Sequence, residues 1–275
     1  VQFIDALSKF VQRGWRKSLI SRYYQSPRKL YATTIAIPPV QSALGPAAYG
    51  ESETGSYCYA ILYEGQLVYK DDITFRFWGL GDDILIVRVG GKIVLNGFYP
   101  RNGNDHDTER ITPHWSSSEP RARDYWLGIQ KSNVGDWITL KAGEPLDMEI
   151  LVGEVPGGLF QALLTVEVQG EDYPQNPELG GPTLPLFKTA ELTLDMMDAI
   201  YIGTHPGDLS VTNGPVFCDY DTTKKDSATR PLASAVEPSP PEAIAVDRKG
   251  LRTWTTAGGQ VLEARYITRM GDKAV

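Results

Sequence analysis

The feature that most constrains the fold is a series of short apolar segments of alternating character, separated by Gly-rich turns. "YCYAILYEGQLVY" and "DITFRFWG" alternate their side chains and are rich in aromatic and β-branched residues, as half-buried strands are. Similar segments follow in "DILIVRVGGKIVLNG", "DWITLKAG", "PLDMEILVGEV" and "LFQALLTVEVQ". Because many short strands with Gly-rich turns build sandwiches or barrels, the sequence predicts a mainly β chain with an antiparallel, jelly-roll-like sandwich.

Turn and helix signals add detail to this prediction. Gly90-Gly91 is typical of a tight primed turn, which needs positive φ at both central positions. Residues 1–24 carry apolar side chains near helical spacing and predict an N-terminal helix, which Pro27 would stop. A short strand is expected over 33–37, with Pro38-Pro39 ending it.

The composition changes along the chain and divides it into five parts. We expect the helix over 1–24, the sandwich over 25–170 and a β-rich extension over 171–220. A Pro/Ser-rich linker follows over 221–249, where "EPSPPE" favours a polyproline conformation. Residues 250–275 predict a C-terminal hairpin with Gly258-Gly259 at its turn.

Charge and motifs narrow the classes of function. A net charge of −7 argues against a nucleic-acid-binding surface, and the chain has no apolar run of about 18 residues that would cross a membrane. The three histidines match no zinc-binding spacing, and neither a nucleophile elbow nor a phosphate-binding loop occurs. We therefore expect a non-enzymatic protein. A carboxylate pair for glycoside hydrolysis stays open, because such pairs form in space.

The two cysteines, Cys58 and Cys218, leave two alternatives open. They form one disulfide between an early strand and a late segment, or they are two buried free thiols, which the sequence slightly favours.

A long polar insertion, roughly 98–133, separates two of the predicted strands. Segments of this length are usually functional or disordered. Asp107 belongs to an acidic stretch, "NGNDHDTE", whose oxygen donors suit calcium, and a mobile polar loop is the alternative. Trp115, Tyr125 and Trp126 predict either a surface on which sugar rings stack or anchors that hold the loop to the sandwich.

The stretch "GLGDDILIVRVGGKIVLNG", followed by "WITLKAGEPLDMEILVGEVPGGLFQALLTVEV", resembles a known family. It is similar to the anthrax protective-antigen-type β-sandwich domain, the fourteen-kilodalton PA module of toxins, adhesins and glycosidases. The match covers roughly 22–169 and departs from the common pattern at Ile84, where many members have Gly. The tail resembles the first half of an SH3-like Sla-type homology-one module, through "RTWT" and "EARY".

The resemblance implies a role for Asp82 and Asp83. In calcium-binding members the two aspartates are joined by a cis bond and hold the ion together with a later loop. That loop would be "SNVGDWITL", with the amide oxygen of Asn133 and the carbonyls of Gly135 and Trp137, and sugar hydroxyls would complete the shell. The alternative is a dyad that only organises its loop by accepting backbone N–H groups.

These observations together predict a binding module of a bacterial envelope or secreted protein, placed outside the cytoplasm. Its partner would be a glycan or an envelope protein, with calcium as the candidate cofactor. The alternatives are a structural subunit of an envelope assembly, formed by copies of the chain or by other proteins, and an accessory domain of a glycoside hydrolase.

Overall fold

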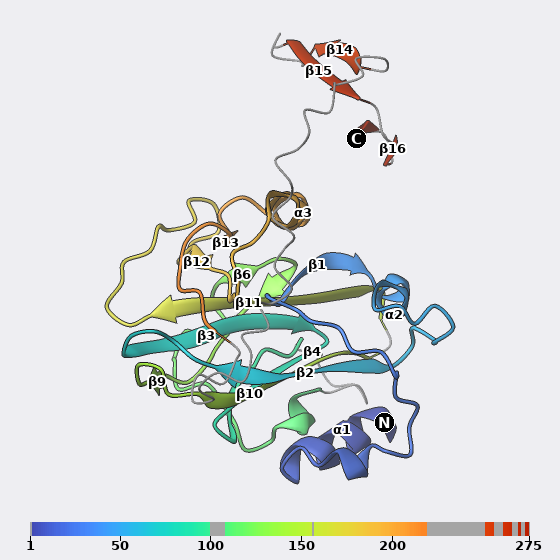
Figure 1. Ribbon diagram of the computed structural model, residues 1–275, viewed down its shortest axis with the longest axis vertical. Helices are drawn as coiled ribbons and strands as arrows, with labels where there is room; N and C mark the ends of the chain where they lie inside the picture. The colour runs from blue at the N-terminus through green and yellow to red at the C-terminus, as the bar shows by residue number, and fades with distance from the viewer. Residues whose placement is uncertain are drawn as a thin grey trace, which may run out of the picture. The chain divides into compact units, whose positions relative to one another are not determined.

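A computed structural model describes residues 2–99, 108–155 and 157–218, together with the strand segments 251–255, 261–265, 269–270 and 273–274 (Figure 1). The chain divides into two compact units, Val1–Thr223 and Lys224–Val275. The candidate site lies in the first unit.

Two antiparallel sheets form the body of the first unit (Figure 1). In one sheet the order is β1 (Ala36–Gln41), β11 (Leu159–Val168), β3 (Ile73–Asp82) and β8 (Asn133–Val134), and β9 (Ile138–Leu140) also pairs with β3. In the other the order is β2 (Tyr59–Leu67), β10 (Leu146–Glu154), β4 (Ile84–Val89) and β5 (Lys92–Asn96). The predicted mainly β, antiparallel fold is confirmed.

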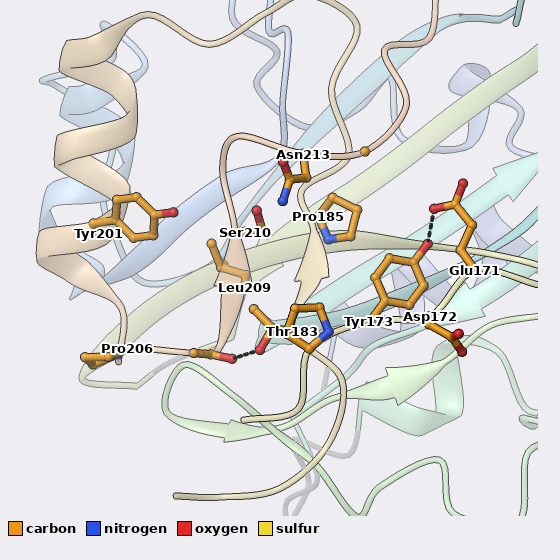
Figure 2. Close-up of a pocket in the computed structure, with 13 residues that line it drawn as sticks. Glu171, Asp172, Tyr173, Thr183, Pro185, Tyr201, Pro206, Leu209, Ser210 and Asn213 are labelled. Atoms are coloured by element: carbon orange, nitrogen blue, oxygen red, sulfur yellow. Dashed lines mark hydrogen bonds between the residues drawn. The ribbon is translucent and has the colours of Figure 1, made fainter. Parts of the chain in front are cut away.

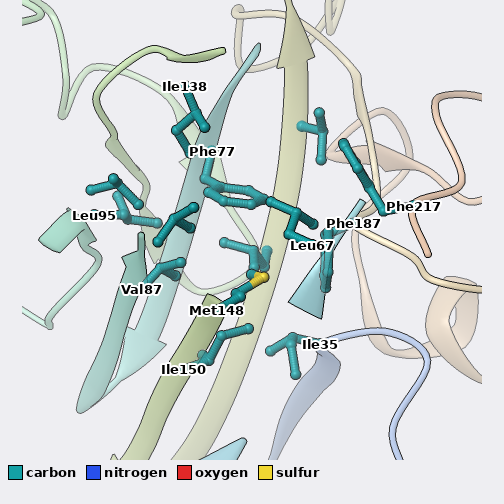
Figure 3. Close-up of a cluster of buried hydrophobic side chains, with 14 of the residues drawn as sticks. Ile35, Leu67, Phe77, Val87, Leu95, Ile138, Met148, Ile150, Phe187 and Phe217 are labelled. Carbon is teal, nitrogen blue, oxygen red and sulfur yellow. The ribbon is translucent and has the colours of Figure 1, made fainter. Parts of the chain in front are cut away.

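The main core lies between the two sheets (Figure 3). Each strand contributes every second residue to it, because successive side chains of a strand point to opposite faces. On β3 these residues are Phe75 and Phe77, and on β10 they are Ile150 and Val152, all of them buried. Phe187 and Phe217, which come later in the chain, close the same core.

The turn between β4 and β5 has the predicted conformation. Gly90 and Gly91 both have positive φ, 55° and 78°, and the strands on either side are paired. Glycine adopts these angles without the steric cost that a side chain would bring.

Helix α1 (Gln2–Gln12) covers the outer face of the β2–β10–β4–β5 sheet (Figure 1). Its buried residues Leu7 and Phe10 belong to a cluster with Ile86 and Leu151. The helix is shorter than the predicted 1–24, because Gly14 at φ 78° turns the chain out of the helical conformation. A short 3-10 turn, η1 (Lys17–Leu19), follows.

The strand predicted over 33–37 was expected to stop at Pro38-Pro39, and that prediction was wrong. β1 continues through both prolines to Gln41, with an irregular register against β11 between Ile37 and Val40. β1 is the last strand of its sheet, so a residue without an amide hydrogen is tolerated there.

Residues 184–211 cover the outer face of the other sheet. Helix α3 (Leu194–Gly203) begins at the N-cap Thr193, whose hydroxyl accepts the Met196 amide at 3.3 Å. β12 (Leu184–Pro185) and β13 (Leu209–Ser210) form a short parallel pair. Segment 171–218 thus contains a helix where a β-rich extension was predicted, because Ile200 packs α3 against Leu80 and Leu163 of the sheet.

The remaining elements are short. In the first unit they are η2 (Ser42–Leu44), α2 (Gly45–Ala48), η3 (Thr108–Ile111), β6 (Trp126–Leu127) and β7 (Gln130–Lys131). Among the described residues, no helix is both long and apolar enough to cross a bilayer.

The second unit contains the predicted C-terminal hairpin. β14 (Leu251–Thr255) pairs with β15 (Val261–Arg265), and β16 (Arg269–Met270) pairs with β17 (Lys273–Ala274). The expected turn at Gly258-Gly259 and the expected linker over 221–249 lie outside the described residues. The SH3-like resemblance of this tail stays a prediction.

The two cysteines are free thiols, each partly buried. Cys58 stands just before β2, whereas Cys218 exchanges backbone hydrogen bonds of 2.9 and 2.7 Å with Val68, just after β2. The intervening strand separates them by roughly 30 Å at its usual rise. A disulfide needs α-carbons within about 7 Å, so this geometry corresponds to the free-thiol alternative.

Candidate functional site

The Asp82–Asp83 dyad stands where the chain passes from one sheet to the other. β3 ends at Asp82, β4 begins at Ile84, and the Asp82–Asp83 peptide bond is cis. Gly81 makes this crossing possible, because a Cβ on it would lie 2.5 Å from the carbonyl carbon of Ile84. The sequence feature "GDD" is therefore the tight junction of the two sheets.

Both carboxylates of the dyad are buried, Asp82 at 6% and Asp83 at 0% exposure. Asp83 binds the end of β10 twice: its amide donates to the Gly153 carbonyl at 3.2 Å, and its Oδ2 accepts the Val155 amide at 2.8 Å. The dyad thus has at least one of the loop-organising hydrogen bonds that the metal-free alternative requires.

A third acidic residue, Glu154, lies between the two residues that bind Asp83, and it is also fully buried. Glu154 contributes to the pKa shifts of two neighbouring groups, Tyr59 and Cys58. Burial, then Glu154, Tyr49 and Asp83, raise the pKa of the Tyr59 hydroxyl above its ordinary value. Burial is also the main cause that raises the pKa of the Cys58 thiol, with smaller contributions from Glu154 and Asp83. Glu154 and Asp83 therefore lie close enough to Tyr59 and Cys58 to influence both groups.

Asn133 lies near the dyad along β3. It pairs with Gly79, three residues before Asp82, which is roughly 10 Å away along the strand. Its amide nitrogen donates to the Asn96 carbonyl at 2.7 Å, and its oxygen accepts the Val134 amide at 3.1 Å. Gly97, the residue after Asn96, accepts the Gly81 amide at 2.7 Å. Asn133 is therefore linked to the junction through Asn96 and Gly97 at the end of β5.

Gly135 and Trp137 are not brought to the dyad. The amide of Gly135 donates to the Phe77 carbonyl at 2.7 Å, and Ile138, beside Trp137, pairs with Phe75. Because β8 and β9 run antiparallel to β3, residues after Asn133 move away from Asp82, by roughly 16 Å or more along the strand. The five predicted ligands therefore do not converge. Within the described ranges, no group of three His, Cys, Asp or Glu side chains has the placement of a metal site.

The segment that does approach this end of β3 was not predicted from the sequence. Gln161 pairs with Asp82 across β3 and β11 and is fully buried. Its side chain binds the turn between β6 and β7, donating to the Leu127 carbonyl at 3.0 Å and accepting the Ile129 amide at 3.1 Å. The antiparallel order of the strands was the available signal: it brings residues before Asn133 toward the dyad.

The predicted aromatic trio is divided between two places. Tyr125 stacks on Trp78, with ring centroids 5.6 Å apart, and Trp126 beside it is 39% exposed. These three rings adjoin a cavity of about 10 Å³, which has room for little more than one water molecule. Trp115 instead donates its ring N–H to Asp136 at 2.9 Å and packs against the main core. Trp115 and Tyr125 thus anchor the insertion, whereas Asp107 lies outside the described residues.

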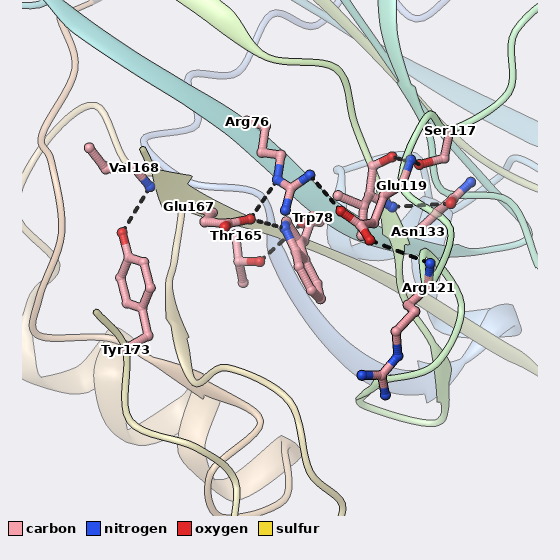
Figure 4. Close-up of polar contacts among 11 residues, drawn as sticks. Arg76, Trp78, Ser117, Glu119, Arg121, Asn133, Thr165, Glu167, Val168 and Tyr173 are labelled. Atoms are coloured by element: carbon pink, nitrogen blue, oxygen red, sulfur yellow. Dashed lines mark hydrogen bonds and ion pairs between the residues drawn. The ribbon is translucent and has the colours of Figure 1, made fainter. Parts of the chain in front are cut away.

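Ion pairs fix the described part of the insertion to the sheet (Figure 4). Arg76 on β3 pairs with Glu167 on β11 at 2.6 Å and with Glu119 of the insertion at 3.2 Å. The ring N–H of Trp78 donates to the same Glu167 oxygen at 2.6 Å. Since all of these groups are at least partly buried, the insertion is held on the outer face of the sheet at this point.

Comparison with known proteins yields likenesses in structure only. No model of a known protein family matches the chain, and no curated protein matches it. The solved structures similar to it include the PA14 sugar-binding domain from an RTX adhesin, with 17% identity, a TM-score of 0.38, and coverage of 57% of this chain and 79% of that one. The PA14 domain of the antifreeze protein MpAFP has 13% identity, a TM-score of 0.37, and coverage of 57% and 73%.

A third similar structure is the A domain of epithelial adhesin 6 from Candida glabrata in complex with Galb1-3GlcNAc. It has 16% identity, a TM-score of 0.28, and coverage of 60% of this chain and 67% of that one. At such identities and scores the likeness does not define a family for this chain.

Proposed function

We propose that this chain is a non-enzymatic binding module that recognises a glycan at the Asp82–Asp83 junction with the help of calcium. One observation carries the proposal: the carboxyl groups of Asp82, Asp83 and Glu154 are all buried at one end of the sandwich. Carboxylate oxygens are the ligands that calcium prefers in proteins, and this group of side chains supplies several of them within a short stretch of structure.

Only part of the predicted ligand set fits such an ion. Asp82 and Asp83 would hold the ion. Asn133 would position the end of β5 beside them through its hydrogen bond to the Asn96 carbonyl. Calcium needs about 6–8 oxygens, so further ones would come from the β6–β7 turn, which Gln161 holds beside the same end of β3. When bound, the ion would present open positions to adjacent sugar hydroxyls. Gly135 and Trp137 are not proposed as ligands.

The proposal includes a location and a partner. A glycan-binding module would act outside the cytoplasm, on an envelope or as a secreted protein, and its partner would be a glycan or a glycosylated envelope protein.

Calcium titration tests the metal. Calcium is expected to raise the Tm of the wild type, because a ligand that binds only the folded state stabilises it. Asp82→Asn should remove that shift, whereas Asp198→Asn, an exposed substitution on α3, should keep it. If the wild-type protein has the same Tm in calcium and in chelator, the proposal that it binds calcium is contradicted.

Glycan binding is tested separately by calorimetry against a panel of saccharides in calcium and in chelator. Additional saccharide heat that appears only in calcium, and that Asp82→Asn loses, supports the proposal. Calcium binding without any calcium-dependent saccharide heat would leave the dyad as a structural metal site. That result would overturn the proposal that the junction binds a glycan.

A second candidate function, a structural subunit of an envelope assembly, is favoured by one exposed segment. Tyr24, Leu30 and Tyr31 are 69%, 63% and 97% exposed, which is unusual for three large apolar side chains within eight residues. Light scattering on the purified protein tests this candidate. Assembly that is lost in Tyr31→Ser supports it, and a monomer at all concentrations contradicts it.

A further inference from the structure

A second hollow lies in the part of the chain that follows the sandwich. It has a volume of about 680 Å³ and is formed entirely by residues between Glu171 and Gly214 (Figure 2). Pockets that bind small molecules usually have about 300–1,000 Å³. It shares no residue with the Asp82–Asp83 junction or with its neighbours Asn133 and Glu154.

Two tyrosine rings stand on opposite walls of this hollow (Figure 2). Tyr201 projects from α3 and is 48% exposed, which leaves a large part of its ring accessible. Tyr173 is held from behind, because its hydroxyl accepts the Val168 amide at 2.8 Å and donates to Glu171 at 3.3 Å. Flat apolar rings on two sides suit a ligand with apolar C–H faces.

The floor between the rings is rigid. Pro185 of β12 packs against Gly214. A Cβ on Gly214 would lie 2.4 Å from the proline ring, and the φ of Gly214 is 90°. Thr183 donates its hydroxyl to the Gly207 carbonyl at 2.8 Å and so fixes the loop that enters β13. The floor is therefore held by contacts within the protein before any ligand arrives, which lowers the entropic cost of binding.

The polar groups of the hollow select the charge of the ligand. Ser210 and Asn213 lie between the two rings and offer both donors and acceptors, and Glu171 and Asp172 stand at one side (Figure 2). None of the lining residues in the described chain is Lys, Arg or His. An anionic ligand would therefore meet only like charge, whereas hydroxyl groups, which both donate and accept, find partners.

We propose that this hollow is a saccharide site that works without a metal and takes a neutral or amino sugar. The ring of the sugar lies between Tyr201 and Tyr173, and its hydroxyls bind Ser210, Asn213 and Glu171. The site does not depend on the function proposed for Asp82 and Asp83, and the chain then has two separate places for a sugar.

The test is calorimetric titration of the full chain in chelator, which removes any contribution of calcium. The panel consists of neutral hexoses and their disaccharides, glucosamine, glucuronic acid and choline. Binding of a neutral or amino sugar is the expected result, with glucuronic acid at least about tenfold weaker because of like-charge repulsion. Choline as the only ligand, or no binding to any member of the panel, would overturn the proposal.

Variants of the walls locate the binding. Tyr201→Ala is expected to weaken saccharide binding about tenfold, Tyr201→Phe by less than about threefold, and Asn213→Ala by several-fold. The matched control is Ile202→Ala, the next residue of α3, which is 84% exposed and does not line the hollow. All three positions are exposed, so thermal melting should show that the four variants fold. Equal affinity in Tyr201→Ala and Ile202→Ala would overturn the placement of the site.

The two proposals are supported or contradicted independently of each other. If Asp82→Asn loses the calcium-dependent heat but still binds saccharide in chelator, the result supports the site at the junction and leaves the second hollow intact. If Tyr201→Ala loses saccharide binding in chelator but calcium still raises its Tm, the result supports the site in the second hollow and leaves the junction intact.

Discussion

At the scale of single residues, glycines decide whether the junction can form. The chain must reverse between Gly81 and Ile84 with almost no room for side chains, and the same end of the sandwich buries three carboxyl groups. A residue with a Cβ at position 81 would push the backbone of β4 outward and move Asp83 away from its partners on β10.

Gly81→Ala tests this geometry. We expect the substitution to lower the free energy of unfolding by about 2–3 kcal/mol, because overpacking beside backbone atoms cannot be relieved by a side-chain rotation. Urea denaturation followed by circular dichroism measures it. Gly55→Ala is the control, since a Cβ there has no atom within 4 Å and should cost less than about 0.5 kcal/mol. Equal effects of the two substitutions would refute the argument.

Asp208 gives a pH dependence whose sign follows from its surroundings. Burial raises the pKa of its carboxyl group, although the Gly128 and His205 amides bind its Oδ2 at 3.0 and 3.3 Å and act in the opposite direction. The folded state therefore holds this proton to higher pH than the unfolded state. The stabilisation is complete below the unfolded pKa of about 3.9 and is lost as the pH rises through the folded value.

Asp208→Asn should remove this contribution while it keeps an oxygen for the two amides. Relative to the wild type, the variant is expected to gain stability as the pH rises from 4 to 7, measured by urea denaturation at each pH. Asp195→Asn, an exposed substitution on α3, should show no such change. A constant difference between Asp208→Asn and the wild type would disprove the assignment.

At the scale of elements, the sequence predicted the strands well and their neighbours less well. The alternating segments became β2, β3, β4, β5, β9, β10 and β11, because alternation is a local property of each strand. The early end of α1 and the passage of β1 through Pro38-Pro39 depend on tertiary position, and no local signal states which strand is at an edge. The same holds for the site: Asp82 and Asp83 are visible in the sequence, but only the register shows that Gln161, not Trp137, faces them.

Helix α1 supplies a test at this scale, because one of its faces is buried against the sheet and against Ile111 of η3. Phe10 is fully buried, lies 5.4 Å from the ring of Trp15, and packs with Ile86 and Leu151. Phe10→Ala is expected to cost about 3–5 kcal/mol of unfolding free energy through lost burial and a residual cavity. Lys9→Ala, on the exposed side of the same helix, should cost less than about 0.5 kcal/mol. A small effect at Phe10 would mean that α1 is not part of the cooperative unit.

At the scale of the whole molecule, the first unit ends later than the sandwich strands. After β11 the chain returns to the core twice, through Phe187, whose amide donates to the Leu164 carbonyl, and through Phe217, whose amide donates to the Lys188 carbonyl. Cys218 then pairs with Val68 at the end of β2. Residues 171–218 are therefore part of the sandwich's core as well as the walls of the second hollow.

Truncation tests where this unit ends. A chain that stops at residue 218 should fold with nearly the stability of the first unit in the full chain. A chain that stops at residue 214 should lose about 3–5 kcal/mol, because it lacks Phe217, which is fully buried against Phe75 and Phe187. Chemical denaturation of both chains measures the difference. Equal stability would show that the return of the chain to β2 is dispensable.

The two prolines of β1 have a consequence beyond the register of one strand. Any exposed sheet edge offers a row of backbone donors and acceptors on which the strand of another molecule can add. Pro38 and Pro39 carry no amide hydrogen, and the Cα of Gly203 in α3 lies so near Pro38 that a Cβ there would be 2.2 Å from the proline ring. The middle of β1 therefore offers no amide donors to an added strand and is covered by α3, which disfavours edge-to-edge pairing between copies of the chain.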